Sequence, residues 1–210
     1  MKIKTILLGA SLAAIVATAQ AQTNPVYSVN VVGYTKLTLP AGFTMFANHM
    51  NTATNTLNSL LGSSGLAPGT TVYTFNRGTG SFDSHTFTGS AWIPDGSLAP
   101  GQGGFIQLAA PSMVIFAGEV TLGTNSNLSI PQGFSIISSK VPQSATLSAL
   151  LLTPATPGDT VYRFNSGTSQ YNSSTWTGSS WIPNPTLNIG ESFFIQTQQP
   201  FNWNRDFVVN

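Results

Sequence analysis

One stretch of the chain occurs twice, and this duplication constrains the fold more than any other feature. Residues 72–94 read VYTFNRGTGSFDSHTFTGSAWIP, and residues 161–183 read VYRFNSGTSQYNSSTWTGSSWIP. The first positions, 72 and 161, and the last, 94 and 183, differ by the same 89 residues. So long a match within one chain indicates an internal duplication. The chain is therefore expected to fold as two similar halves.

The repeated block predicts short strands joined by tight turns. Residues 72–75 and 161–164 are β-branched and aromatic, which suits a half-buried strand. The third position is Thr in one copy and Arg163 in the other, so it is expected to face water. Its neighbours are then expected to face a core: Tyr73, Tyr162, Phe75 and Phe164.

Turn residues follow each of these strands. Asn begins turns and Gly supplies positive φ, so residues 76–79 and 165–168 predict hairpin turns with Gly78 and Gly167 at positive φ. A later strand is expected to begin at Trp92 and Trp181. It should end at the prolines two residues further on, because proline has no N–H for the ladder.

The duplication extends over most of the chain. Residues 39–43 match 130–134, 56–61 match 146–151, and 105–107 match 194–196. Paired leucines after Thr or Ser in the second of these segments predict a short helical turn. The sequence thus predicts an all-β fold of two tandem small β-sandwich or barrel-like domains, residues 22–118 and 119–210, each with at most one short helix.

The first 21 residues have the pattern of a secretory signal peptide. Lys2 and Lys4 precede an apolar run over residues 6–17, and Ala19-Gln20-Ala21 suits cleavage. The run is shorter than the ~20 residues that a membrane-spanning helix needs, and no later stretch is long enough, so no membrane span is expected. We expect a secreted or cell-surface protein, with the periplasm as the alternative.

Few side chains carry charge. Charged residues make up 6% of the chain, against roughly 25% in ordinary soluble domains. Without Lys2 and Lys4, five Lys and Arg remain against six Asp and Glu, so nucleic acid is not an expected partner. Cys is absent and only two His are present, so we expect neither a metal site nor a disulfide, and no cofactor-binding loop is recognisable.

Several motifs resemble a poorly characterised family of secreted bacterial tandem β-repeat proteins. The segment NVVGY at residues 30–34 follows the signal peptide, and VYxFN, GxxW and PGxGF motifs begin at Val72, Gly89 and Pro100. The resemblance covers nearly the whole mature chain and implies a β fold and export, but no reaction. The second repeat departs from it at residues 189–192, which read IGES.

Charged residues give little support to catalysis, because nearly every charge in one copy has an uncharged residue in the other. Asp83-Ser84-His85 is the one compact acid, hydroxyl and imidazole cluster. A hydrolase would need a cleft that joins Asp83 and His85 to an acid such as Asp159 or Glu119. We expect no catalytic residue and no enzyme activity. His49, opposite Lys140 in the other copy, is expected at the surface.

Aromatic residues, in contrast, occupy matching positions in both copies. They either fill two cores or form a platform on which sugars stack. For the second interpretation the candidate binding residues are Trp92, Trp181, Trp176 and Tyr171.

Three functions are consistent with these observations. The first is a non-catalytic secreted or cell-surface structural or interaction module; the second is a carbohydrate-binding module; the third is a secreted hydrolase. Extracellular polysaccharide and cell-envelope proteins are the expected partners. Two repeats carry three strand-like boundary segments: residues 26–30, 117–121 and 206–210. One strand edge is therefore expected to lack a partner, and head-to-tail self-association through residues 26–32 is a further hypothesis.

Overall fold

The structure is a computed structural model that describes residues 31–62 and 64–209. The predicted signal peptide, residues 1–21, and the segment 26–30 lie outside the described residues, as does most of the segment expected to self-associate. Within the described ranges, no helix has the length and apolar character needed to cross a membrane.

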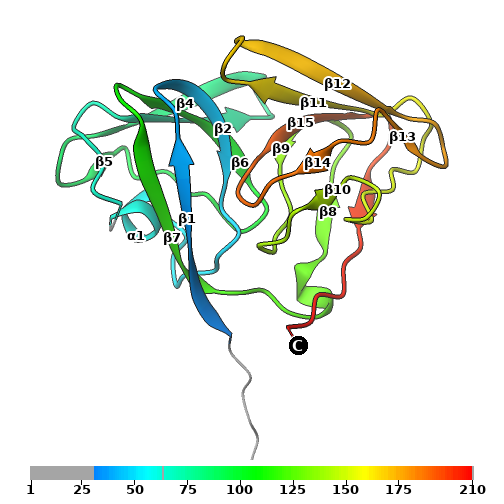
Figure 1. The fold of residues 1–210 in the computed structure, drawn as a ribbon, viewed down its shortest axis with the longest axis horizontal. Coiled ribbons are helices and arrows are strands. Elements are labelled where there is room, and N and C mark those ends of the chain that lie inside the picture. Colours follow the sequence, from blue (N-terminus) through cyan, green and yellow to red (C-terminus); the bar gives the residue numbers. More distant parts are fainter. Residues whose placement is uncertain (1–30, 63, 210) are drawn as a thin grey trace, which may run out of the picture.

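The first half consists of a five-stranded antiparallel sheet and a two-stranded one (Figure 1). The larger sheet has the order β2 (Gly42–Ala47), β6 (Gly103–Leu108), β3 (Thr71–Asn76), β4 (Ser81–Phe87) and β5 (Trp92–Ile93). The smaller sheet pairs β1 (Val32–Leu39) with β7 (Ser112–Glu119), and the helix α1 (Leu57–Leu61) packs beside β7.

The second half repeats this order. Its larger sheet consists of β9 (Gly133–Ile137), β15 (Phe193–Thr197), β11 (Thr160–Asn165), β12 (Gln170–Trp176) and β13 (Trp181–Ile182). Two short pairs complete it: β8 (Leu128–Ile130) with β16 (Phe201–Trp203), and β10 (Ala145–Thr146) with β14 (Thr186–Leu187); η1 (Thr124–Ser126) precedes β8. The predicted all-β, duplicated fold is confirmed. The boundary between 118 and 119 stays a prediction, and β7 runs to Glu119.

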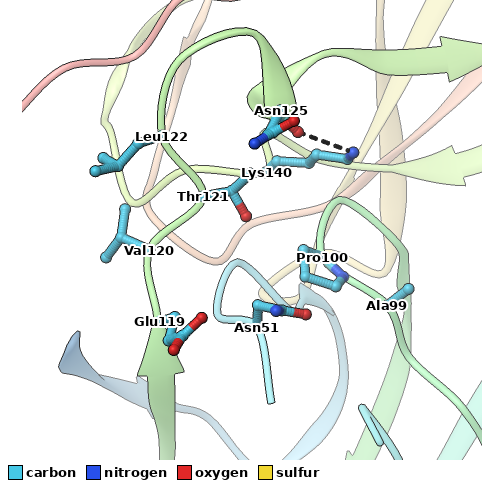
Figure 2. A pocket seen from close by; sticks show the side chains of 9 residues that line it. All are labelled: Asn51, Ala99, Pro100, Glu119, Val120, Thr121, Leu122, Asn125 and Lys140. Atoms are coloured by element: carbon cyan, nitrogen blue, oxygen red, sulfur yellow. Dashed lines mark hydrogen bonds between the residues drawn. The ribbon is translucent and has the colours of Figure 1, made fainter. Parts of the chain in front are cut away.

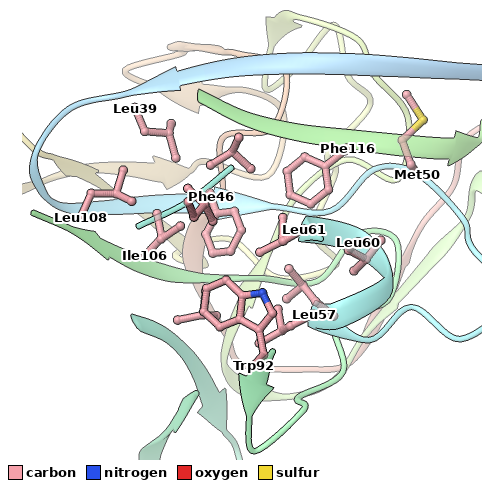
Figure 3. Packing of buried hydrophobic residues seen from close by; sticks show 14 residues of the cluster. Leu39, Phe46, Met50, Leu57, Leu60, Leu61, Trp92, Ile106, Leu108 and Phe116 are labelled. Atoms are coloured by element: carbon pink, nitrogen blue, oxygen red, sulfur yellow. The ribbon is translucent and has the colours of Figure 1, made fainter. Parts of the chain in front are cut away.

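Each half has its own hydrophobic core between its larger sheet and its smaller one. In the first half, Phe46 and Ile106 from the larger sheet meet Phe116 from β7 and the leucines of α1 (Figure 3). Trp92 lies against the same leucines. In the second half, Val161, Phe193 and Trp203 occupy a corresponding cluster. Burial of these side chains is the main favourable term in folding.

The expected helical turn is an α-helix in the first half alone. Thr56 caps α1 by accepting a hydrogen bond from the backbone N–H of Ser59, and Leu57, Leu60 and Leu61 are buried. In the second half the chain makes only hydrogen-bonded turns, and Leu151 has a φ of 59°. A left-handed residue ends a helix. Leu151, which corresponds to the buried Leu61, is therefore 55% exposed, and the next residue, Leu152, is buried instead.

The expected orientation of the repeated strand is wrong for the third position, although Tyr73, Phe75 and Phe164 do pack against a hydrophobic cluster. Val72 and Val161 face the cores. Thr74 and Arg163 lie on the same face as these valines and do not face open water: Thr74 contacts His85, and Arg163 forms an ion pair of 2.6 Å with Glu191. The neighbouring aromatic residues lie on the opposite face of the sheet, where they pack between the two halves: Tyr73, Phe75 and Phe164.

The halves contact each other reciprocally. The N–H of Ala47 donates to the carbonyl of Gly190 at 2.8 Å, and the N–H of Ser138 donates to the carbonyl of Gly101 at 3.0 Å. These are equivalent pairs, since residue 138 corresponds to 47 and residue 190 to 101. Such reciprocity is the mark of an isologous, two-fold arrangement. The approach is so close that a Cβ on Gly103 would lie 2.3 Å from the side chain of Ser192.

The hairpin turns differ from the sequence prediction in one respect. Gly78 and Gly167 do not have positive φ; the left-handed positions are Gly80, at 69°, and Ser169, at 55°. Asn76 and Asn165 accept hydrogen bonds from the N–H groups two and three residues on. This Asn turn holds each following glycine in ordinary backbone and moves the left-handed residue to the end of the turn.

These turns predict different costs for two glycine substitutions. Gly80→Val should lower the free energy of unfolding by about 1–2 kcal/mol, because a β-branched residue is strained at positive φ. Gly78→Val is the matched control and should cost clearly less. Urea unfolding of both variants measures the difference. Equal losses would show that the left-handed position does not control this turn.

Candidate functional site

The tryptophans proposed for sugar stacking lie in the cores. Trp92 and Trp181 are 2% exposed and Trp176 is 6% exposed. The indole N–H of Trp181 donates to the carbonyl of Leu152 at 2.6 Å. Burial removes the exposed ring face that stacking requires, so the expectation is corrected for these three residues. Tyr171 alone of the four candidates is exposed, at 47%.

Tyr171 belongs to a larger set of aromatic residues on those faces of the five-stranded sheets that point away from the two cores. On these faces, five aromatic positions of the first half have aromatic equivalents in the second. We call these ten residues the aromatic face: Phe43, Tyr73, Phe75, Phe82 and Phe105, with Phe134, Tyr162, Phe164, Tyr171 and Phe194.

Ring geometry across the aromatic face is nearly the same in both halves. Phe75 lies 5.5 Å from Phe194 at an interplanar angle of 80°, and Phe164 lies 5.3 Å from Phe105 at 82°. Phe105 and Phe194, which are equivalent, contact each other at 6.4 Å. Edge-to-face pairs of this kind are favourable arrangements of aromatic rings. The centre of the face is therefore a packed floor shared by the two halves.

Two grooves flank this floor. The first groove has a volume of about 560 Å³, and the second about 510 Å³. The same four aromatic positions line both: Phe43, Tyr73, Phe82 and Phe105 in the first groove, and Phe134, Tyr162, Tyr171 and Phe194 in the second. The first is also bordered by Phe164, Ser169 and Tyr171, so Tyr171 adjoins both grooves. Phe43, Phe82, Phe134 and Tyr171 are 42–47% exposed.

Each groove has a matching polar group at its edge. The hydroxyl of Tyr73 donates to the side-chain oxygen of Gln107 at 3.1 Å, and that of Tyr162 donates to Gln196 at 3.3 Å. Both glutamines are exposed. Among the described residues that line the grooves, none carries a charge. The grooves are thus shallow, open apolar depressions with hydroxyl and amide groups at the rim.

Several of these aromatic pairs belong to the duplicated segments, but the sequence alone does not predict that they form a site. The Gly-Phe match at Phe43 and Phe134 and the Phe-Ile-Gln match at Phe105 and Phe194 were visible as parts of the duplication. The missing information was the orientation of the strands. Alternation along each strand does not identify this face, because the strands carry apolar residues on both faces.

The residues of the hydrolase hypothesis lie in three separate places. Asp83 accepts a hydrogen bond from Asn76 at 3.3 Å, on β4. His85, on the same strand, uses Nδ1 to donate to the carbonyl of Pro94 at 3.0 Å, and its Nε2 lies 3.1 Å from the Thr74 hydroxyl. Asp159 is buried in the other half, where it accepts from the N–H of Gln198. Glu119 ends β7.

Glu119 lines a different cavity at the seam between the halves. This cavity has a volume of about 510 Å³, and Glu119 and Lys140 lie at its opposite ends (Figure 2). The Lys140 ammonium donates to the carbonyl of Asn125 at 3.3 Å, and the backbone of Glu119 pairs with that of Asn51. No group of three or more His, Asp or Glu side chains in the described ranges is placed to hold a metal ion.

His49 is buried, which contradicts its expected place at the surface. Its Nε2 lies 2.5 Å from the hydroxyl of Thr35, and its ring lies against the edge of Phe116. Burial lowers the pKa of His49 from 6.5 to about 4. Its equivalent in the second half is Lys140, at the seam between the halves, so comparison of the two copies does not indicate that His49 is buried.

The neutral state of His49 predicts an acid-sensitive fold. Because its pKa is lower in the folded chain than in the unfolded chain, the unfolded chain binds the proton first as the pH falls. Stability should therefore drop by roughly 3 kcal/mol between pH 6.5 and pH 4. His49→Gln, which keeps a polar partner for Thr35, should flatten this part of the curve. Thermal unfolding across this pH range measures both proteins, and parallel curves would contradict the assignment.

Comparison with protein-family models, with curated proteins and with solved structures finds no match for this chain.

Proposed function

We propose that this chain is a non-catalytic interaction module that works outside the cytoplasm, and that it binds its ligand in the two aromatic grooves. The signal-peptide pattern of residues 1–21 supports the location. The repeated grooves support the binding role, and the placement of the histidines and carboxylates supports the absence of catalysis.

The repetition of the groove is the observation that carries the proposal. A residue needed for a single catalytic event has to exist in only one copy, whereas a duplicated binding surface keeps its contacts in both. All four lining positions are aromatic in both halves. The charged residues behave differently: Arg77 corresponds to Ser166, and Glu191 corresponds to Gln102.

Exposure of the lining residues favours binding over a purely structural role. Phe43, Phe82, Phe134 and Tyr171 each leave almost half of their surface in water. The largest exposed apolar patch on a monomeric protein is often a functional site. These four residues also surround two concave volumes of the size that small ligands or chain segments occupy.

The histidines support a module without catalysis. Both ring nitrogens of His85 have hydrogen-bonding partners in the fold. His49 is buried with a pKa of about 4, so it is neutral and inaccessible at ordinary pH. General acid–base catalysis needs a group within reach of substrate, and these two imidazoles serve the packing of the first half.

Adsorption to cell-envelope fragments tests the binding role without naming the ligand. Wild-type chain is expected to sediment with purified bacterial envelope fragments, and Phe43→Ser/Phe134→Ser should lose at least tenfold in the bound fraction. Ile93→Ser/Ile182→Ser is the matched control, because both isoleucines are 62% exposed, occupy equivalent positions and lie outside the grooves. This control should bind as wild type does.

Two results would contradict the proposal. One is equal loss in both double variants, which would indicate non-specific apolar adsorption. The other is unchanged binding by a folded Phe43→Ser/Phe134→Ser protein. Thermal unfolding establishes that each variant is folded, and sugar release from the fragments by wild type would favour the hydrolase alternative instead.

A further inference from the structure

The exposed area of the aromatic face is too small for a stable protein partner. A buried aromatic side chain contributes about 150–250 Å², so four half-exposed rings offer roughly 350 Å². Specific protein–protein interfaces bury about 800 Å² on each partner. A narrow ligand that lies within the grooves fits the available surface better than a second folded protein does.

Lining chemistry restricts that ligand to an uncharged one. Moving a charge from water to an apolar groove is costly unless an opposite charge meets it, and no charged side chain lines the described parts of either groove. Nucleic acids, acidic polysaccharides and charged peptides therefore fit poorly. An uncharged ligand loses no such hydration free energy.

The rim of each groove adds a requirement for hydroxyl groups. Tyr73 with Gln107, and Tyr162 with Gln196, place a phenol and an amide side by side at equivalent edges. The amide NH₂ of each glutamine is a hydrogen-bond donor. Ser169 adds a hydroxyl to the first groove, and Ser173 adds one to the second. A pyranose ring combines an apolar C–H face, which suits aromatic walls, with hydroxyls around its edge, which suit this rim.

The two-fold arrangement determines how a polymer occupies both grooves. The contacts between the halves are reciprocal, as in Ala47 to Gly190 and Ser138 to Gly101. Reciprocal contacts arise when two units are related by a rotation and not by a shift along one direction. A rotation of this kind reverses any directional chain that lies across the aromatic face. One straight chain with a reducing and a non-reducing end therefore cannot make the same contacts in both grooves.

We propose that each aromatic groove binds a segment of a neutral polysaccharide, and that one protein molecule holds two such segments running in opposite directions. This inference rests on the proposed function and adds the ligand class and the number of sites. Two weak sites that engage the same polymer network bind it with higher avidity than one site does. The protein then links two chains, or two stretches of one chain that folds back.

Calorimetric titration with short oligosaccharides tests the ligand class and the number of sites together. The probes are the soluble hexasaccharides of cellulose, chitin, xylan and mannan, with hexagalacturonate as the charged counterpart. Wild type is expected to bind two molecules of a neutral hexasaccharide and to bind hexagalacturonate at least tenfold more weakly. Phe43→Ser and Phe134→Ser should each reduce the number from two to one, and Ile93→Ser/Ile182→Ser should keep two.

A second pair of variants covers the case in which a serine variant fails to fold. Gln107→Ala and Gln196→Ala change exposed residues at the rim and leave the aromatic walls in place. Loss of one hydrogen bond should weaken the corresponding site by about tenfold. Unchanged affinity in both folded glutamine variants would overturn the assignment of the rim.

The remaining outcomes separate this inference from the proposed function. Wild type that sediments with envelope fragments but binds none of the neutral hexasaccharides overturns the polysaccharide assignment and leaves the binding surface in place. Tighter binding of hexagalacturonate overturns the requirement for a neutral ligand. A single bound hexasaccharide overturns the two opposed segments. Loss of envelope binding in the control variant as well as in Phe43→Ser/Phe134→Ser overturns the proposed function itself.

Discussion

Packing between the two halves is the interaction on which the rest of the structure depends. Each five-stranded sheet is covered on one face by its own small sheet and on the other by the aromatic floor. Phe105 and Phe194 meet at the centre of that floor, and both halves contribute to it equally. The close approach at Gly103 and Ser192 leaves little freedom for one half to shift against the other.

The apolar packing on both faces of each large sheet also explains which features the sequence predicts and which it does not. The duplication, the short strands, the turn residues and the all-β class could be predicted, because these depend on local composition and self-similarity. The face of each strand could not. Alternation identifies a core only when the other face is polar, and Val72, Tyr73 and Phe75 present apolar side chains on both faces. Arg163 misled the assignment because its charge is paired with Glu191.

Two further differences arise from side-chain contacts that the strand pattern does not indicate. Gly78 was the natural candidate for positive φ, but the Asn76 side chain accepts from the next N–H groups and moves the left-handed position to Gly80. His49 was placed at the surface by comparison with Lys140, yet the first half buries it beside Thr35 and Phe116. The first of these contacts lies within the turn itself, whereas the second brings together segments that are far apart in the sequence. For the candidate site, only Tyr171 was identified from sequence, since the larger tryptophans fill the cores.

The two halves differ in their charged residues and agree in the residues of the aromatic face. Arg77 exists only in the first half and donates to the carbonyls of Gln132 and Phe134, while the ion pair of Arg163 exists only in the second. Each arginine has thus taken on a structural role of its own: Arg77 links the two halves, and Arg163 pairs within the second half. The inner aromatic residues are explained by packing at the interface between the halves. Phe43 and Phe134 lie at its margin, almost half exposed, and each packs against two rings of its own half. Packing accounts for the buried side of each ring, and the ligand that we propose would lie against the exposed side.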